Sequence, residues 1–321
     1  MAPHGKDAHA PHGHGHQHGV SAQADRRYLT AALLLIAAYM AAEVVVGLIA
    51  RSLALISDAG HMLTDTAAIV LALLAMRLAA RPPRGGFTYG LRRAEILSAQ
   101  LNGLTLLGLA GYFLFEGARR LLDPPPVEGL FVVVTGAVGV VVNIAATWLL
   151  SKANRTSLNV EGAFQHLLND LYAFIATTLA GLVVWLTGFT RADAIAALVV
   201  AVLMLKAGWG LVRDAARVFL ETAPTGLDPA EAGARLAALP GVTEVHDLHI
   251  WEITSGYPSL SAHILVGPAA SCTAVREAAE ELLHDVYGIA HITLQVEQAH
   301  PPPATHCPDP HGPAYAGDPA R

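Results

Sequence analysis

The chain has 321 residues, of which 53% are hydrophobic and only 14% charged, and its mean hydropathy is +0.44. Soluble domains carry about a quarter charged residues, so this composition excludes an ordinary soluble globule. The net charge of −6 provides no overall basic surface for nucleic acid, and two cysteines are too few for a disulfide framework. Sixteen histidines are the unusual feature of the composition.

Residues 1–26 form a segment rich in Gly, His, Ala and Pro without an apolar period, which is typical of a disordered tail. The segment lacks the layout of a signal peptide, so we expect no cleavage. Six histidines of this segment either bind metal ions near the cytoplasmic entrance of the membrane helices that are predicted below, or lie in a simple spacer. They are His4, His9, His12, His14, His16 and His18.

Six apolar segments follow, each long enough to cross about 30 Å of hydrocarbon. They are residues 28–50, 53–80, 94–119, 130–150, 158–187 and 192–213. Arginine and lysine are more frequent in the second and fourth links, near 77–93 and 152–155, than in the links on the opposite side. We therefore expect six transmembrane helices over residues 27–221, with both termini in the cytoplasm.

After Glu221 the chain becomes more polar, and its pattern predicts a small α+β domain over residues 222–300 with the element order αββαβ. The expected helices are 229–239 and 273–287, and the expected strands are 242–254, 257–267 and 292–298. A domain of about 75 residues is marginal alone, which favours docking or dimerisation. The Pro-rich residues 301–321 are predicted to be a disordered tail.

The second and fifth apolar segments each contain a histidine followed four residues later by an aspartate: His61 with Asp65, and His166 with Asp170. In a helix, this spacing puts both side chains on one face. If the two helices touch, two nitrogens and two oxygens close a tetrahedron suited to Zn²⁺ near the membrane midplane. The alternative is a set of unrelated polar contacts between helices, although buried ionisable groups are costly in a membrane.

Four motifs, taken together, resemble the cation diffusion facilitator family on its zinc-transporter side. They are SLALISDAGHMLTD (52–65), FTYGLRRAEILSAQLNG (87–103), SLNVEGAFQHLLNDL (157–171) and VHDLHIW (245–251). The resemblance extends from about residue 28 to 298. It implies a six-helix metal/proton antiporter with a ferredoxin-like cytosolic domain, usually homodimeric. It also implies that the two His-x-x-x-Asp pairs form the transport site, and it suggests a bacterial inner (plasma) membrane.

Ligand type indicates the metal, because imidazole suits Zn²⁺ and related ions. Zinc is therefore the expected substrate, with Co²⁺, Cd²⁺, Ni²⁺ and Fe²⁺ left open. A ligating histidine must be neutral and a ligating aspartate ionised, so metal and protons compete for the same atoms. This predicts zinc export in exchange for protons by alternating access, without a catalytic cofactor.

Two alternatives remain at this stage. A membrane metalloenzyme needs an open coordination position and a general base, and the sequence has no HExxH motif. A membrane-anchored metal sensor without transport would leave the intramembrane pairs without a role.

Other polar residues lie within the apolar segments. Asp58 shares a face with His61 and is either a further ligand or a partner of Arg51. Asp193 is expected to complement the dipole at the start of the sixth helix. Interhelical hydrogen-bonding or gating roles are expected for Glu43, Asn102, Glu116 and Asn143.

The resemblance suggests a second metal site in the cytosolic domain at His246, His263 and Glu297, and the alternative is a solvated surface. Strand alternation predicts His246 and His249 on opposite faces. Further ligand candidates and neighbouring histidines are His284, His291, His300, His306, Cys307 and His311. Residues 81–90 contain no His, Asp or Glu, so the site that some relatives carry there is predicted to be absent.

Overall fold

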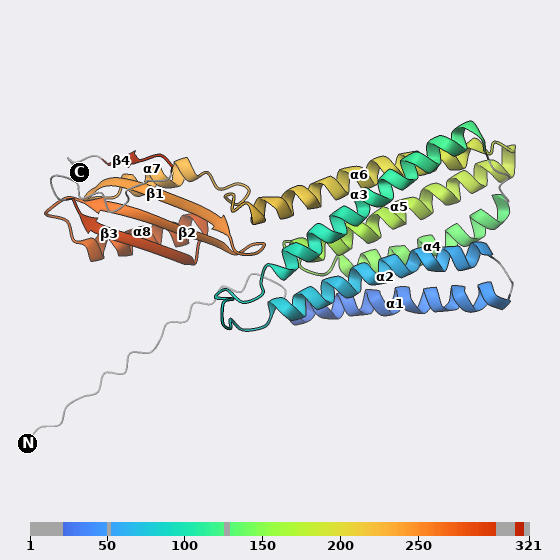
Figure 1. Ribbon diagram of the computed structural model, residues 1–321, viewed down its shortest axis with the longest axis horizontal. Coiled ribbons are helices and arrows are strands. Elements are labelled where there is room, and N and C mark those ends of the chain that lie inside the picture. Colours follow the sequence, from blue (N-terminus) through green and yellow to red (C-terminus); the bar gives the residue numbers. More distant parts are fainter. Residues whose placement is uncertain (1–21, 50–52, 125–128, 300–311, 318–321) are drawn as a thin grey trace, which may run out of the picture.

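The computed structural model describes residues 22–49, 53–124, 129–299 and 312–317. Within these residues, six long helices run side by side along the long axis, and a smaller domain containing a β-sheet lies at one end (Figure 1). The helices are α1 (Ala22–Ile49), α2 (Leu53–Ala79), α3 (Ala94–Leu122), α4 (Gly129–Leu150), α5 (Leu158–Thr187) and α6 (Arg191–Phe219). They lie where the six apolar segments were expected.

Four of these helices are long and apolar enough to cross a membrane, judged on the described residues alone: α3, α4 from Val132, α5 and α6. Large apolar side chains on their outer surfaces are exposed, for example Phe115 at 69%, Trp148 at 59% and Trp209 at 63%. Exposed apolar surface of this extent is typical of contact with lipid. The helical membrane domain is therefore confirmed, while the crossing of the bilayer by all six helices stays a prediction.

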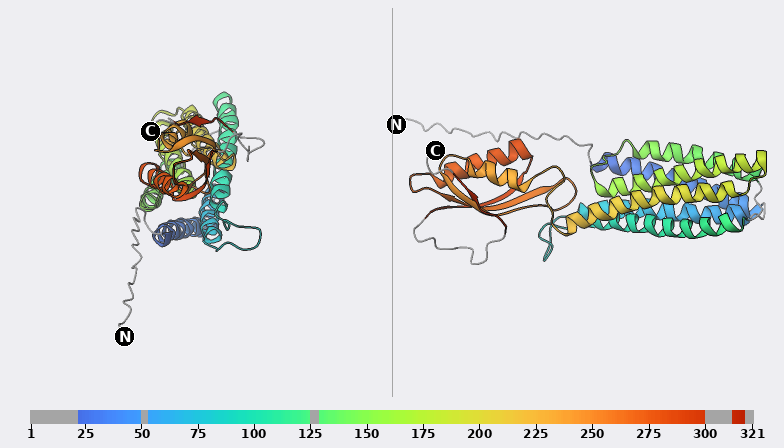
Figure 2. Two further views of the ribbon diagram at one scale, coloured as in Figure 1. Left: turned by 90° about the vertical axis from the view of Figure 1, so that its left-hand side faces the viewer. Right: turned by 90° about the horizontal axis from the view of Figure 1, so that it is seen from above.

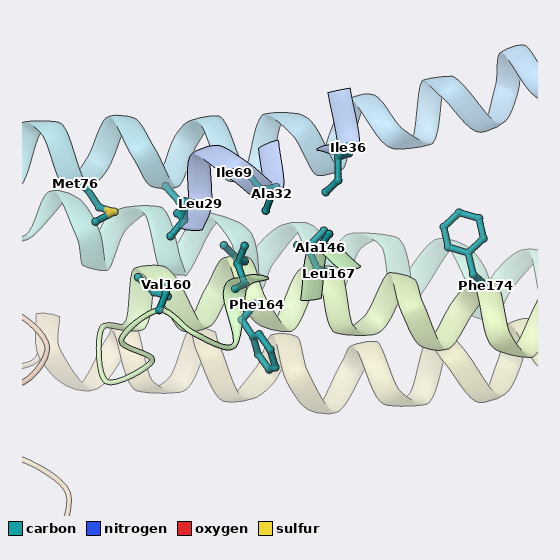
Figure 3. Close-up of a cluster of buried hydrophobic side chains, with 14 residues drawn as sticks. Leu29, Ala32, Ile36, Ile69, Met76, Ala146, Val160, Phe164, Leu167 and Phe174 are labelled. Atoms are coloured by element: carbon teal, nitrogen blue, oxygen red, sulfur yellow. The ribbon is translucent and has the colours of Figure 1, made fainter. Parts of the chain in front are cut away.

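A core of apolar side chains joins α1, α2, α4 and α5 (Figure 3). Leu29 and Ile36 of α1 and Ile69 of α2 are almost fully buried, and Leu167 of α5 packs into the same cluster. The two helices that carry the His-x-x-x-Asp pairs therefore belong to one packed group. A second cluster, which includes Leu106 of α3 and Met204 of α6, joins the remaining two helices, and Ala173 and Ala176 of α5 pack against it.

Helices α3 and α6 approach closely at a pair of glycines. A Cβ atom added to Gly208 would lie 2.9 Å from the carbonyl oxygen of Gly103 and 3.0 Å from a side-chain carbon of Leu107. Small residues let transmembrane helices pack backbone against backbone. The absence of a side chain at Gly208 is therefore required by the α3–α6 contact.

We expect Gly208→Ala to destabilise this helix pair by about 1–3 kcal/mol, because the added methyl group overpacks the contact. Gly210→Ala is the matched control, since a Cβ atom there meets nothing within 4 Å among the described residues. Thermal unfolding of the purified protein in detergent should show a lower midpoint for Gly208→Ala only. Equal midpoints for the two variants would contradict this reading of the contact.

The smaller domain follows the predicted element order. It contains α7 (Pro229–Ala237), β1 (Val242–Glu252), β2 (Pro258–Val266), α8 (Cys272–Tyr287) and β3 (His291–Gln298). Helix α7 begins with an N-cap, because the Asp228 side chain accepts from the Ala230 amide at 2.9 Å and Pro229 occupies the first turn. Strand β1 pairs antiparallel with β2, and β2 pairs parallel with β3. An α+β domain is confirmed, and the ferredoxin-like topology stays an expectation.

A short strand, β4 (Tyr315–Ala316), adds to the free edge of β1 and gives the strand order β3-β2-β1-β4. Sequence patterning did not predict it. The ring of Tyr315 packs against Gly233 of α7, and the Gly317 amide donates to the Thr243 carbonyl at 2.9 Å. The first part of the β1 edge, near Thr243–Val245, is therefore covered by residues 315–317.

The link between α2 and α3, called here the α2–α3 loop (residues 80–93), contacts the smaller domain. The guanidinium of Arg92 lies 4.5 Å from the ring centroid of Tyr257, on the turn between β1 and β2. Arg93 donates to the carbonyl of Ile253, at the start of the same turn, at 3.4 Å, and it also forms an ion pair of 3.1 Å with Glu221, which follows α6. The membrane domain and the smaller domain are thus joined by side-chain contacts as well as by the chain.

A ring contact and a cavity belong to the same boundary. The rings of Tyr89 and His291 have centroids 5.8 Å apart and meet edge to face. A cavity of about 1020 Å³ lies between the α2–α3 loop and β1, with Trp251 and His249 in its lining. His291 therefore belongs to the domain boundary rather than to a cluster of histidines.

Candidate metal centres

His166 and Asp170 lie one turn apart on α5, and the structure leaves each only 1% exposed. Their Nε2 and Oδ2 atoms are 3.8 Å apart. Two ligands of a tetrahedral Zn²⁺ with bonds of about 2.0–2.1 Å lie about 3.4 Å apart, so a small rotation of either side chain lets both bind one ion. The predicted pairing on α5 is therefore geometrically suited to a metal.

The position of this pair argues for a function. Neighbouring buried residues on α5 include Leu167 and Asn169, whose side-chain amide donates to the Gln165 carbonyl within the helix at 2.6 Å. Burying a carboxylate beside an imidazole among apolar helices is costly unless an ion or a proton compensates the charge. A carboxylate and an imidazole side by side can hold either a divalent cation or protons.

His61 and Asp65 lie one turn apart on α2, as the sequence predicted, but their side chains are outside the described residues. Helix α2 packs against α5. The side-chain amide of Asn159 on α5 donates to the carbonyl of Ala72 on α2 at 2.9 Å. The convergence of all four side chains stays a prediction, and the two helices that carry them are in contact.

Polar groups near the C-terminal end of α3 and the N-terminal end of α6 form an ion-pair network. Glu116 accepts from Arg120 at 2.9 Å, and Arg120 approaches Asp193 of α6 at 3.5 Å. Asp193 lies in the first turn of α6, where a carboxylate favours the helix dipole. These carboxylates therefore connect helices near one end of the bundle.

The remaining polar positions have different environments. Asn143 is 1% exposed, and its amide donates to the Gly139 carbonyl of its own helix at 3.1 Å, so this bond is not interhelical. Asn102 is buried on α3, with its side-chain amide 3.5 Å from the place of a Cβ on Gly162 of α5. The structure does not describe the side chains of Glu43 and Asp58, and Arg51 falls outside the described residues.

In the smaller domain, His246 of β1 is paired across the strands with His263 of β2. Their ring centroids are 5.4 Å apart, and Glu244 lies 3.0 Å from Nδ1 of His246. Residues paired across strands project from the same sheet face. Two of the three predicted cytosolic ligands are therefore adjacent, with a carboxylate beside them.

The prediction for His249 was wrong. A bulge interrupts β1 between His246 and His249, where Asp247 adopts a positive φ of 52°. The extra residue changes the alternation, so His249 pairs with Ser261 and shares the face of His246. Unbroken alternation had put the two histidines on opposite faces.

Glu297 lies on β3 and is paired with Leu265, so it shares the face of His263 but is separated from β1 by a strand. His284 lies in the last turn of α8 and contacts Asp285 at 2.9 Å. Among the described residues, no three His, Cys, Asp or Glu side chains converge in an arrangement that could hold a metal. His300, His306, Cys307 and His311 are outside the description, as are all the histidines of residues 1–21.

Family models match most of the chain. The model of the cation efflux transmembrane domain matches residues 29–220, and the model of the cation efflux protein cytoplasmic domain matches residues 224–299. The boundary between the two matches coincides with the change of composition after Glu221. Both parts of the chain therefore have counterparts in a single kind of protein.

Similar proteins are metal transporters. The metal cation efflux system protein CzcD of Cupriavidus metallidurans is 38% identical over 89% of this chain and 90% of that protein. The zinc transporter ZitB of Escherichia coli is 36% identical over 88% and 92%, respectively. The cadmium, cobalt and zinc/H(+)-K(+) antiporter of Bacillus subtilis is 32% identical over 90% and 93%. Among solved structures, the metal-bound C-terminal domain of the CzcD transporter from Cupriavidus metallidurans is 38% identical. The match covers 22% of this chain and 99% of that chain, with a TM-score of 0.21.

Proposed function

Because the chain belongs to the cation efflux, or cation diffusion facilitator, family, we propose that it exports Zn²⁺ from the cytoplasm in exchange for protons. The transport site is formed by His61, Asp65, His166 and Asp170. The observation that carries the proposal is the burial of His166 beside Asp170 within the helical membrane domain, with their donor atoms 3.8 Å apart.

Contact between α2 and α5 supports a site shared by these helices. The two helices run in opposite directions (Figure 1). The hydrogen bond from the Asn159 amide to the Ala72 carbonyl, 2.9 Å long, crosses their interface in a buried position. A hydrogen bond from a side chain to a neighbouring helix sets the register of the two helices.

That register favours the four-residue site. On α2, Asp65 lies seven residues, or about two turns, from Ala72, which accepts the hydrogen bond. On α5, His166 lies the same seven residues from Asn159, which donates it. Because the helices are antiparallel, equal distances from this hydrogen bond lie at the same height along the bundle. Asp65 is therefore predicted to lie level with His166, and His61 level with Asp170. Each histidine then faces an aspartate of the other helix, which is the arrangement that a tetrahedral ion needs.

Proton exchange follows from the chemistry of the ligands. Zn²⁺ binds neutral imidazole and ionised carboxylate, so protons that reach the site from the outer side weaken metal binding and promote release. Metal arriving from the cytoplasm displaces those protons in turn. Alternating exposure of the site to the two sides then couples the two movements.

The proposed metal is zinc because the donor set combines two imidazoles with two carboxylates. Co²⁺, Cd²⁺, Ni²⁺ and Fe²⁺ are the alternative substrates. Initial transport rates measured for each ion under one pH gradient will rank them. A rate for any of the four that exceeds the zinc rate would contradict zinc as the main substrate.

The test of the function is transport by the purified full-length protein in sealed vesicles. With a pH gradient imposed, Zn²⁺ entry and lumenal pH are followed together by two fluorescent indicators. We expect zinc flux that depends on the gradient, with proton movement in the opposite direction. Zinc that binds stoichiometrically without any flux would contradict the proposal.

We further propose a homodimer in a bacterial inner membrane with both termini in the cytoplasm. The match to the cytoplasmic domain of cation efflux proteins over residues 224–299 supports a cytoplasmic location for the smaller domain. The α2–α3 loop contacts this domain, so the loop lies on the same side. Labelling of single introduced cysteines from either side of sealed vesicles tests this orientation.

The second proposed site is cytosolic and regulatory, at His246, His263 and Glu297. The adjacent rings of His246 and His263 offer part of a ligand set for Zn²⁺ on the open face of the sheet. Metal bound there is proposed to draw two protomers together and to favour the exporting state. Glu297 is the more distant ligand, because β2 lies between it and β1.

We expect His263→Ala to lower the zinc affinity of the dimeric protein about 10-fold or more and to weaken the dependence of flux on cytoplasmic zinc. His284→Ala is the control, because the His284 side chain is exposed on α8 and contacts its neighbour Asp285 rather than another histidine. Analytical ultracentrifugation with and without zinc measures association. Unchanged association and unchanged zinc dependence in His263→Ala would reject the regulatory site.

A further inference from the structure

The α2–α3 loop is strongly basic. No acidic residue occurs between Asp65 and Glu95, whereas five arginines lie in this stretch. They are Arg77, Arg81, Arg84, Arg92 and Arg93. A positive charge at this place helps to orient a membrane protein, but orientation alone does not require any folded arrangement of the arginines.

The arginines divide into two groups by their contacts. Arg92 and Arg93 contact the smaller domain at Tyr257 and at the Ile253 carbonyl, and Arg93 also pairs with Glu221. Arg77, Arg81 and Arg84 are exposed, and within the described part of the chain none of the three has an ion pair. Three guanidinium groups are thus available to an anion from outside the protein.

Other cytoplasmic cations differ in this respect. Arg155, in the link before α5, makes two hydrogen bonds to Glu161, of 2.7 and 3.1 Å, which raise the pKa of its guanidinium further. Arg213 contacts Asp214 at 2.9 Å. Arg77, Arg81 and Arg84 differ from these two arginines because no carboxylate of the described residues pairs with them.

The loop has a defined fold around two of its free arginines. Gly90 has a φ of 72°, and its amide donates to the Phe87 carbonyl at 2.9 Å. A Cβ atom on Gly90 would lie 3.0 Å from the carbonyl oxygen of Arg81, so the two sides of the loop touch. A cavity of about 320 Å³ is lined by Arg81, Arg84 and Phe87, together with Pro82, Gly90 and Leu91. Two arginines and a phenylalanine thus line one concave site.

The site lies where lipid headgroups are expected. The loop joins the ends of two apolar helices, and seen along the long axis it projects sideways beyond the bundle (Figure 2, left). Phe87 is 61% exposed, and Leu97 on the first turns of α3 is also 61% exposed. Aromatic side chains next to arginines at this level are typical of the membrane–water interface.

We propose that Arg81 and Arg84 bind the phosphate of an anionic phospholipid of the cytoplasmic leaflet, and that Phe87 inserts beside its glycerol and acyl region. Guanidinium groups match phosphate oxygens in a bidentate geometry. The occupant is a lipid rather than free phosphate, because the cavity combines the two arginines with an exposed aromatic residue at the ends of two apolar helices. The same loop holds the smaller domain through Arg92 and Arg93, so the lipid fixes the loop against which that domain rests.

The test uses the full-length protein in detergent, titrated with phosphatidylglycerol or phosphatidylcholine and measured by native mass spectrometry. We expect one phosphatidylglycerol per protomer to bind preferentially. Each basic residue near a charged membrane surface contributes about fivefold in affinity, so Arg81→Gln with Arg84→Gln should weaken this binding about 25-fold. Equal retention of phosphatidylcholine would overturn the proposal.

Two comparisons separate a folded site from general charge. Arg26→Gln with Arg27→Gln removes the same charge from exposed positions of α1 at the same end of the bundle, and should leave the preferential lipid bound. Phe87→Ser keeps every charge and should still weaken binding by severalfold. Equal losses in the two arginine double variants, or displacement of the lipid by millimolar glycerol phosphate, would overturn the lipid site. Zinc transport under an imposed pH gradient, measured for each variant, verifies that the variant is folded.

Discussion

Replacement of Asp170 by asparagine is expected to abolish proton-coupled zinc transport. The substitution keeps the shape of a side chain that is 1% exposed and removes its negative charge. Residues that merely support a metal ligand contribute about 10–100-fold, so the loss of a ligand should exceed about 100-fold. The carboxylate also carries a proton in the proposed exchange, and asparagine cannot titrate.

The measurement is the initial rate of zinc entry into vesicles under an imposed pH gradient, together with zinc binding at equilibrium. Asp193→Asn is the matched control, because it makes the same chemical change in the ion pair with Arg120 at the far end of α6. We expect the control to transport zinc at a rate within a few-fold of the wild type. If Asp170→Asn retained coupled flux, the proposed site between α2 and α5 would be wrong.

Loss of the Asn159 amide should have the second largest effect. Asn159→Ala removes the 2.9 Å hydrogen bond to the Ala72 carbonyl and with it the bond that sets α5 against α2. The two His-x-x-x-Asp pairs are on different helices, so a change of register disturbs ligands that are two turns away. We expect the transport rate at low zinc to fall about 10–100-fold, as for other residues that position metal ligands.

Asn143→Ala is the control for Asn159→Ala. Asn143 is equally buried, but its amide donates to Gly139 within α4, so its loss affects one helix only. The positioning role predicts a higher KM for zinc in Asn159→Ala, with a thermal midpoint no lower than that of the control. If both variants had the same KM for zinc and Asn159→Ala were only less stable, Asn159 would have a structural role and no positioning role.

Much of the helical domain could be predicted from the sequence because apolar length is a property of single segments. The predicted segment 158–187 agrees with α5 at both ends, and Gly188 ends this helix in the left-handed conformation with a φ of 71°. The pairing of Gly103 with Gly208 could not be predicted in the same way. It depends on which two helices meet, and a single sequence contains no direct signal for that.

The candidate sites show the same division. His166 and Asp170 share a helix face, and four-residue spacing is enough to predict that they lie side by side. His246 and His249 lie on a strand whose alternation is broken by a bulge at Asp247, which depends on local backbone conformation. Strand β4 is two residues long, and its pairing with β1 arises from tertiary contact, so periodicity could not reveal it.

The docking of the smaller domain on the α2–α3 loop has a mechanical consequence. The domain is attached to α6 by the chain and to the start of α3 by Arg93, which also donates to the Ile253 carbonyl at 3.4 Å. Helices α3 and α6 are packed together through their glycines, and α5, which carries His166 and Asp170, contacts both of them as well as α2. A rotation of the domain is therefore expected to move α3 and α6 together and to be transmitted to α5 through its contacts with both helices. Over 29 residues, or about 44 Å, a tilt of about 5° displaces the far end of α3 by about 4 Å.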